Sequence, residues 1–202
     1  MEGASGIVYG LHHLDQEATL AVNSLSSPFT DGVWMLFSDR KVWYLLYAAL
    51  ALMLFVRMDW KKALVVLVSV ALTVVACDQA ANLVKYSVAR LRPVWDNYMV
   101  SGGIHRLEGR GSFYGFFSAH AANALGVAVA VVMGFRSGDK TRSYRGLAWI
   151  MYTWAVLVGL SRVFVGKHFL GDVTVGFCAG LLFGWIFGTL ARWIIGKYLL
   201  HL

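Results

Sequence analysis

The chain alternates long apolar stretches with short polar segments. Five apolar runs occur, at about residues 42–57, 62–84, 118–136, 146–161 and 172–195. Several have apolar cores shorter than the roughly 20 residues that a membrane-spanning helix needs, so flanking aromatic and cationic side chains must complete their span. A soluble helical bundle, the alternative, would need polar outer faces, which these runs almost entirely lack. The pattern predicts an all-α polytopic membrane bundle of about five transmembrane helices.

Residues 1–41 follow a different pattern. Apolar Leu14, Val22 and Phe29 interleave with polar Asp15 and Asn23. This mixture is typical of an amphipathic helix that lies in the membrane interface and does not cross it. We therefore predict an interfacial N-terminal segment that leads into the first span, within a single membrane-embedded domain covering residues 1–202.

The composition supports a membrane location. Hydrophobic residues make up 58% of the chain and charged residues only 14%, whereas soluble domains are about a quarter charged. The net charge of +7 could suggest nucleic acid, but the cations are spread over short loops and form no basic face. A membrane surface and an anionic lipid substrate fit this distribution better. The oligomeric state is left open.

The polar segment from Ser161 to Asp172 separates the last two apolar runs. His168 and Asp172 lie four residues apart, so on a helical turn the carboxylate can hold one imidazole nitrogen and leave the other free to attack an electrophile. Arg162 precedes a turn at Gly166 and can direct its guanidinium at an oxyanion such as phosphate. Alone, the segment is read equally well as a loop with a surface histidine and a helix-capping aspartate.

Two further segments favour a phosphate site. Lys85 and Arg92 lie seven residues apart, which is two turns along one helix face, and Pro93 then ends the helix. Ser118 and His120 stand at the head of another apolar run, where free backbone N–H groups and the helix dipole attract an anion. With five spans, all three segments fall on the same side of the membrane.

These segments resemble the three signature motifs of the type 2 phosphatidic acid phosphatase superfamily. In this chain the motifs read Lys85-x6-Arg92-Pro93, Ser118-x-His120 and Ser161-Arg162-x5-His168-x3-Asp172. The resemblance covers residues 85–172, the motif-bearing core, and implies an integral-membrane lipid phosphatase. The second motif departs from the family's usual Pro-Ser-Gly-His, since this chain has Phe117-Ser118-Ala119-His120, with Ala119 where a glycine is usual. Its methyl group limits the close approach of a phosphate but keeps the backbone N–H.

The resemblance also implies a role for each motif residue. His168 would be the nucleophile that forms a phosphohistidine, Asp172 would orient it, and His120 would act as acid and base toward the leaving oxygen and the water. The expected phosphate ligands are Lys85, Arg92, Ser118, the N–H group near Ala119, and Arg162. No metal and no cofactor are expected, since fixed cations can neutralise the phosphate and no cluster has metal-ligand spacing.

Two other features bear on the site. Asp78 interrupts the second apolar run, and an intramembrane carboxylate is usually paired, so we expect it to support a cation such as Lys85 or Arg162. The long connection between Arg92 and Phe117 either caps the site and contacts a headgroup or is an ordinary interfacial loop. The sequence favours neither interpretation.

The motifs do not choose the substrate. The candidates are undecaprenyl diphosphate, lipid A phosphates, phosphatidylglycerol phosphate and phosphatidic acid, the first two being favoured if the site faces outward. A lipid-to-lipid phosphotransferase would use the same residues. A non-catalytic lipid-binding or transport protein, and a vanadium-dependent haloperoxidase, explain the residue set and the membrane character less well.

Charge in the loops predicts an orientation. The loops on the far side from the motifs, with the tail cations, hold nine of the 18 Lys and Arg residues, and three on the motif side are committed to the motifs. The positive-inside rule then places the far loops in the cytoplasm. In a bacterium, this orients the site toward the periplasm from the inner membrane.

A stripe of glycines marks the last apolar run. Gly176, Gly180, Gly184 and Gly188 recur every four residues and so share one helix face. Small residues at this spacing allow two helix backbones to approach closely. We expect the stripe to serve packing within the bundle ahead of dimerisation.

Overall fold

The computed structural model describes residues 2–199 and is built from helices joined by short loops. The helices run in chain order as follows: α1 Glu2–Asn23, α2 Pro28–Ser38, η1 Arg40–Trp43, α3 Tyr44–Arg57, α4 Trp60–Val88, η2 Pro93–Trp95, α5 Asn97–Ser101, α6 Ala119–Gly138, α7 Arg145–Phe164 and α8 Leu170–Tyr198. The predicted all-α class is confirmed.

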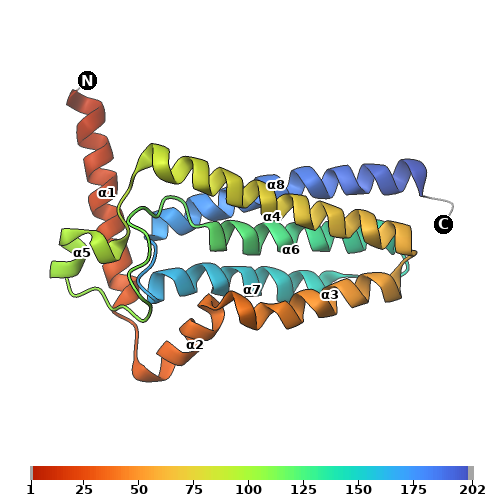
Figure 1. Cartoon of the computed structure of the whole chain (residues 1–202), viewed down its shortest axis with the longest axis horizontal. Helices are drawn as coiled ribbons and strands as arrows, with labels where there is room; N and C mark the ends of the chain where they lie inside the picture. The colour runs from red at the N-terminus through yellow and green to blue at the C-terminus, as the bar shows by residue number, and fades with distance from the viewer. Residues whose placement is uncertain (1, 200–202) are drawn as a thin grey trace.

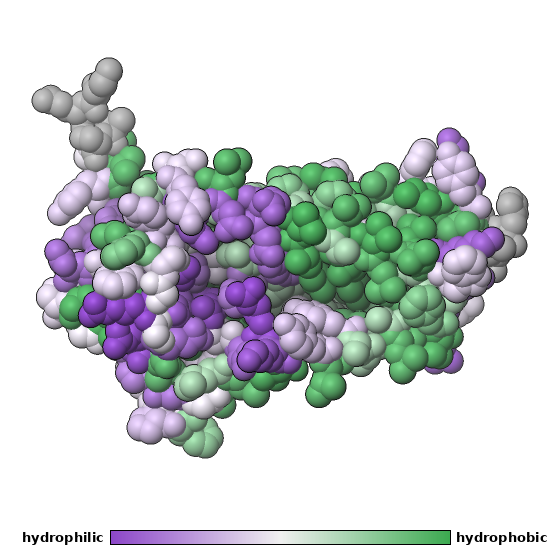
Figure 2. Space-filling model, in the orientation of Figure 1, coloured by the Kyte–Doolittle hydropathy of each residue, from purple (hydrophilic) through white to green (hydrophobic). Residues whose placement is uncertain are grey.

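Each of the five apolar runs forms a helix along the bundle (Figure 1). The helices α4, α6, α7 and α8 are long and apolar enough to cross a membrane. Helix α3 has 14 residues, which at about 1.5 Å per residue is shorter than the hydrocarbon layer. On the face shown in Figure 2, apolar side chains cover much of the length of the bundle, and hydrophilic residues gather at the end that carries α1 and α5. This distribution suits a bundle surrounded by lipid.

Helix α6 forms the centre of the bundle, with α4, α7 and α8 packed around it. The glycine stripe of α8 explains its closest contact. A Cβ atom added at Gly180 would lie 2.2 Å from the carbonyl oxygen of Ala122, and one at Gly184 would lie 2.6 Å from that of Gly126. Only glycine allows such an approach, so the prediction that the stripe packs within the bundle is confirmed.

The predicted interfacial segment forms two helices. Helix α1 runs across the end of the bundle, and α2 leads obliquely toward α3 (Figure 1). Apolar side chains of α1 such as Leu11 and Leu14 are exposed, whereas Gln16, Thr19 and Asn23 are buried against the protein. Helix α1 thus crosses the bundle axis with apolar side chains exposed, an arrangement that suits the predicted interfacial helix.

The three motif segments lie together at this same end. The first spans the end of α4, the second begins α6, and the third joins α7 to α8. The predicted end of the first motif's helix is wrong: α4 ends at Val88, where Ala89 adopts a left-handed φ of 51°, and Pro93 instead begins η2. Arg92 therefore lies outside the helix and does not share a helix face with Lys85. In the turn after α7, Gly166 adopts a positive φ of 76°, which glycine allows. The predicted clustering on one side of the bundle is confirmed.

Candidate active site

His168 lies in the short loop between α7 and α8 and is only 3% exposed. The turn at Gly166 brings it there, and that turn needs glycine for a second reason. A Cβ atom at Gly166 would stand 2.9 Å from the carbonyl oxygen of His105. The loop that carries His168 is therefore packed directly under the long connection between α5 and α6.

The two ring nitrogens of His168 have different partners. Nδ1 lies 3.3 Å from Oδ2 of Asp172, and Nε2 lies 3.3 Å from Nη1 of Arg92. A carboxylate can only accept a hydrogen bond and a guanidinium can only donate one, so the proton belongs on Nδ1 and the lone pair on Nε2. Burial lowers the pKa of His168 to about 4, against the opposing effect of Asp172. Burial therefore favours the neutral imidazole, which carries a lone pair on Nε2.

Asp172 is completely buried in the first turn of α8. Besides His168, its carboxylate accepts hydrogen bonds from the backbone N–H of Phe169 at 3.1 Å and from Nη1 of Arg90 at 2.9 Å. Its carbonyl oxygen accepts the backbone N–H of Ser118 at 3.0 Å. This last bond joins the second and third motifs directly.

Arg162 and Lys167 surround a carboxylate, that of Glu108. Nη1 of Arg162 lies 3.2 Å from Oε1 of Glu108, and Nζ of Lys167 lies 3.7 Å from Oε2. The hydroxyl of Ser38 bonds both Glu108 and Arg162. Burial alone would raise the pKa of Glu108, but Arg162, Ser38 and Lys167 outweigh it and hold that pKa below its usual range. Glu108 is therefore a carboxylate anion in the cation cluster.

Arg92 is anchored on its other sides as well. Its guanidinium donates to the carbonyl oxygens of Tyr114 at 3.2 Å and Lys167 at 3.3 Å, and to the hydroxyl of Ser112 at 3.3 Å. A Cβ atom at Gly115 would meet Cγ of Arg92 at 2.9 Å. Burial lowers the pKa of Arg92, and a guanidinium in a protein stays charged.

The remaining predicted phosphate ligands stand at helix ends near this cluster. Ser118 is fully buried and caps α6, where its hydroxyl accepts the N–H of Ala121 at 3.4 Å. Ala119 is the first residue of α6 and His120 follows it in the first turn. Lys85 lies in the last turn of α4, where its ammonium donates to Asn82 at 3.4 Å.

Asp78 forms no ion pair with either of the cations named as its expected partners. Its carboxylate accepts a hydrogen bond from Nδ2 of Asn123 at 2.8 Å, and no ion pair joins it to Lys85 or Arg162 among residues 2–199. The cause is helix packing, since α4 and α6 lie side by side and Asn123 faces Asp78 one turn after His120. Asp78 thus contacts the helix that carries His120 and does not contact a motif cation.

Four residues of this cluster were not predicted: Ser38, Arg90, Glu108 and Lys167. Arg90 and Lys167 stand beside motif residues in the chain, so proximity was a signal for them. For Glu108 the only signal was the interpretation that the long connection caps the site, and Ser38 of α2 carried no signal. The contacts of Glu108 show that this connection reaches the motif residues. Within the described part of the chain, no three His, Cys, Asp or Glu side chains gather as metal ligands would.

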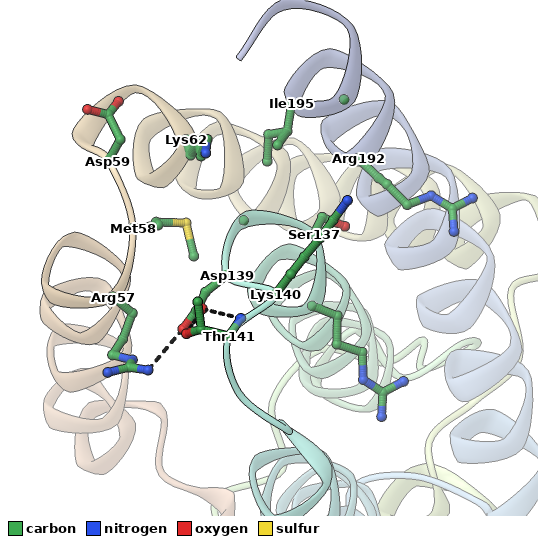
Figure 3. A pocket seen from close by; sticks show the side chains of 13 residues that line it. Arg57, Met58, Asp59, Lys62, Ser137, Asp139, Lys140, Thr141, Arg192 and Ile195 are labelled. Carbon is green, nitrogen blue, oxygen red and sulfur yellow. Dashed lines mark hydrogen bonds and ion pairs between the residues drawn. The ribbon is translucent and has the colours of Figure 1, made fainter. Parts of the chain in front are cut away.

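A hollow of about 540 Å³ lies at the opposite end of the bundle, between α3, α4, α6 and α8. Figure 3 shows Lys62, Lys140 and Arg192 around it, with Arg57 bonded to Asp139 at 3.0 Å. None of the three motifs contributes a residue to this hollow. The two ends of the bundle therefore differ, one carrying the predicted site and the other the loop cations.

Comparison with known proteins places the chain in a family. The sequence profile of the PAP2 superfamily matches residues 60–195. A lipid A 4'-phosphatase of Bacteroides thetaiotaomicron is 32% identical over 184 residues, 90% of this chain and 79% of that protein. A lipid A 4'-phosphatase of Porphyromonas gingivalis is 29% identical over 172 residues, 85% of this chain and 70% of that protein.

Two solved structures share the fold. A phosphatidylglycerolphosphate phosphatase from Bacillus subtilis matches with a TM-score of 0.73 at 22% identity, and the match covers 92% of this chain and 88% of that chain. LpxE of Aquifex aeolicus matches with a TM-score of 0.62 at 21% identity, and the match covers 85% of this chain and 92% of that chain. The motif resemblance and the predicted enzyme class are thus confirmed, and the chain belongs to the PAP2 superfamily as an integral-membrane lipid phosphatase.

Proposed function

We propose that the protein removes a phosphate monoester from lipid A, at the 4' position, through a phosphohistidine on His168. The observation that carries the mechanism is the arrangement of His168, whose Nδ1 faces Asp172 and whose Nε2 faces Arg92. Two relatives that are lipid A 4'-phosphatases by name support this substrate above the other candidates.

The reaction has two steps. Nε2 of His168 attacks the phosphorus, the P–N bond forms, and the P–O bond to the sugar breaks while His120 gives a proton to the leaving oxygen. A water then attacks the phosphohistidine, His120 takes its proton, and the P–N bond breaks to release inorganic phosphate. Asp172 stabilises the positive charge that the His168 ring acquires in the first step.

Cations bind the phosphate in this proposal. Arg92 and Arg162, with Lys85, Ser118 and the N–H groups at the start of α6, are the groups that would hold its oxygens, because stabilising dispersed negative charge is most of the work in phosphoryl transfer. Nε of Arg162 is buried and has no hydrogen-bond partner among residues 2–199. An arriving oxyanion would supply that missing acceptor.

Phosphate release from purified protein in EDTA tests the proposal. We expect release from lipid A that carries a 4'-phosphate, in preference to undecaprenyl diphosphate, phosphatidylglycerol phosphate and phosphatidic acid. Mass spectrometry of the products should show dephosphorylated lipid A and free phosphate. A lipid that gains the phosphate would instead identify a phosphotransferase, and preferred release from another lipid would overturn the assigned substrate.

Glu108 should compete with the substrate phosphate. Its carboxylate already occupies Arg162 and Lys167, so a phosphate can bind there only after displacing it, which lowers the apparent affinity. We expect Glu108→Gln to bind vanadate, a phosphate mimic, about 10-fold more tightly. Vanadate inhibition constants of the wild type and of Glu108→Gln check this, and Glu17→Gln, at an exposed position of α1, is the control. Weaker binding in Glu108→Gln would show that the carboxylate holds the cations in place for the phosphate.

The active site is proposed to face the periplasm from the bacterial inner membrane. The cations Lys62, Arg136, Lys140 and Arg192 around the opposite hollow support this, since short cytoplasmic loops are rich in Lys and Arg. A periplasmically active phosphatase reporter fused after residue 140 should therefore be inactive, while one fused within the loop after Gly103 should be active. The reverse result would invert the topology.

A further inference from the structure

Helix α1 turns one row of polar side chains toward the protein. Asp15, Thr19 and Asn23 recur every four residues and so share one face. Thr19 and Asn23 are fully buried, whereas Leu11 and Leu14 are 62% and 61% exposed. A helix at the membrane surface contacts lipid with its apolar side. The polar row instead packs against the protein, where it contacts the third motif.

Two residues of α1 cap the start of α8. Oδ1 of Asp15 accepts the backbone N–H of Gly171 at 2.8 Å, and Oγ1 of Thr19 accepts that of Leu170 at 3.0 Å. The first N–H groups of a helix have no acceptor inside it, and usually the preceding residue supplies one. Here that residue is Phe169, which has no side-chain acceptor. The caps therefore come from α1, and they hold the turn that carries Asp172.

A third residue of this face of α1, Asn23, caps the end of α7. Its Nδ2 donates to the carbonyl oxygens of Val163 at 3.0 Å and Phe164 at 3.2 Å, which are among the last carbonyls of that helix. Its Oδ1 accepts the N–H of His105 at 2.7 Å. One face of α1 thus secures both borders of the loop that carries His168.

A second link runs through Arg90. Its Nη2 donates to Oδ2 of Asp15 at 2.7 Å, and its Nη1 donates to Oδ1 of Asp172 at 2.9 Å. The guanidinium also lies over the ring of Phe169, 4.0 Å from its centroid. Asp172 is completely buried, and its carboxylate needs the hydrogen bond from Arg90, because a buried carboxylate without partners is costly. Asp15 keeps Arg90 oriented toward it.

We propose that Asp15 and Thr19 are positioning residues for phosphoryl transfer. Through the α8 caps and Arg90 they hold Asp172 where it keeps the His168 imidazole in its nucleophilic tautomer and direction. The interfacial helix α1 is then a working part of the active site. This inference rests on the proposed roles of His168 and Asp172. It differs from a purely structural role of α1, which would contribute to stability and leave turnover per folded molecule unchanged.

Asp15→Asn tests the link with the least change in shape. The amide oxygen can still accept from Gly171, but the charge that attracts Arg90 is lost. We expect kcat to fall about 10- to 100-fold with KM nearly unchanged, because small misplacements of catalytic groups have effects of this size. Glu17→Gln is the matched control, since Glu17 is exposed on the same helix and its contact there is with His13. It should retain wild-type kcat.

A double-mutant cycle separates positioning from stability. If Asp15 acts through Arg90, the variant with both Asp15→Asn and Arg90→Gln should turn over no more slowly than Arg90→Gln alone. Effects on kcat that multiply would overturn the link. Thermal unfolding of each variant identifies the folded fraction, and kcat is compared per folded molecule.

Thr19 provides an independent variant should Asp15→Asn not fold. Thr19→Val keeps the shape and removes the acceptor for Leu170, whereas Thr19→Ser retains it. We expect kcat to be reduced in Thr19→Val and to be near the wild-type value in Thr19→Ser. Wild-type kcat in Thr19→Val or in Asp15→Asn, beside an inactive His168→Ala, would refute the positioning role alone. An active His168→Ala would refute the proposed function instead.

Discussion

Replacing His168 by alanine is expected to lower phosphate release by about 10⁴-fold or more, because the variant has no nucleophile to form the covalent intermediate. The cations that bind phosphate remain in place, so lipid binding should change little. Release of labelled phosphate from lipid A measures the loss, and vanadate binding shows that the site is otherwise intact. A phosphorylated histidine trapped by rapid quenching should appear in the wild type and be absent from the variant.

The control for this experiment is His13→Ala. His13 lies on α1, is partly exposed, and pairs with Glu17 at 3.6 Å, away from the motif residues. Its removal should leave turnover within about two-fold of wild type, as expected for a surface substitution. Turnover of His168→Ala at the wild-type rate would contradict the assignment of the nucleophile.

Asp172→Asn is expected to lower kcat by about 10³- to 10⁴-fold, the range seen when the carboxylate that orients a catalytic histidine becomes an amide. An amide can present its NH2 group to Nδ1 of His168, which favours the tautomer with the proton on Nε2 and so removes the attacking lone pair. It also removes the charge that stabilises the imidazolium and that pairs with Arg90 at 2.9 Å. Single-turnover rates with lipid A measure the effect on the chemical step.

Asp139→Asn is the matched control for this variant. Asp139 is also a buried aspartate in an ion pair, with Arg57 at 3.0 Å, but it stands at the opposite end of the bundle. Thr141, Tyr144 and Arg57 hold its pKa below the usual range, so its charge contributes to stability above acidic pH. The control should therefore unfold at a lower temperature while its kcat per folded molecule stays near wild type. Equal losses of kcat in both variants would show that Asp172 acts through stability.

The sequence by itself determined the class of the molecule and the identity of its motif residues. Long apolar runs can only satisfy their backbone in lipid as helices, so composition and periodicity were enough to predict the bundle. The motif residues could be named because they resemble the three motifs of a known family, whereas their spacing alone indicated only a catalytic pair and an anion site. The glycine stripe of α8 likewise predicted close packing from spacing alone.

The tertiary structure decided which groups complete the site. Ser38 and Glu108 reach Arg162 from segments 124 and 54 residues away in the chain, and no local pattern encodes such contacts. The partner of Asp78 was mispredicted for the same reason, since the nearest cations in sequence are not the nearest groups in space once α4 packs on α6. The polar face of α1 was visible as a helical pattern, but its partners were not. A buried carboxylate such as Asp172 needs donors that only packing can supply, and here those donors are held by a helix more than 150 residues earlier in the chain.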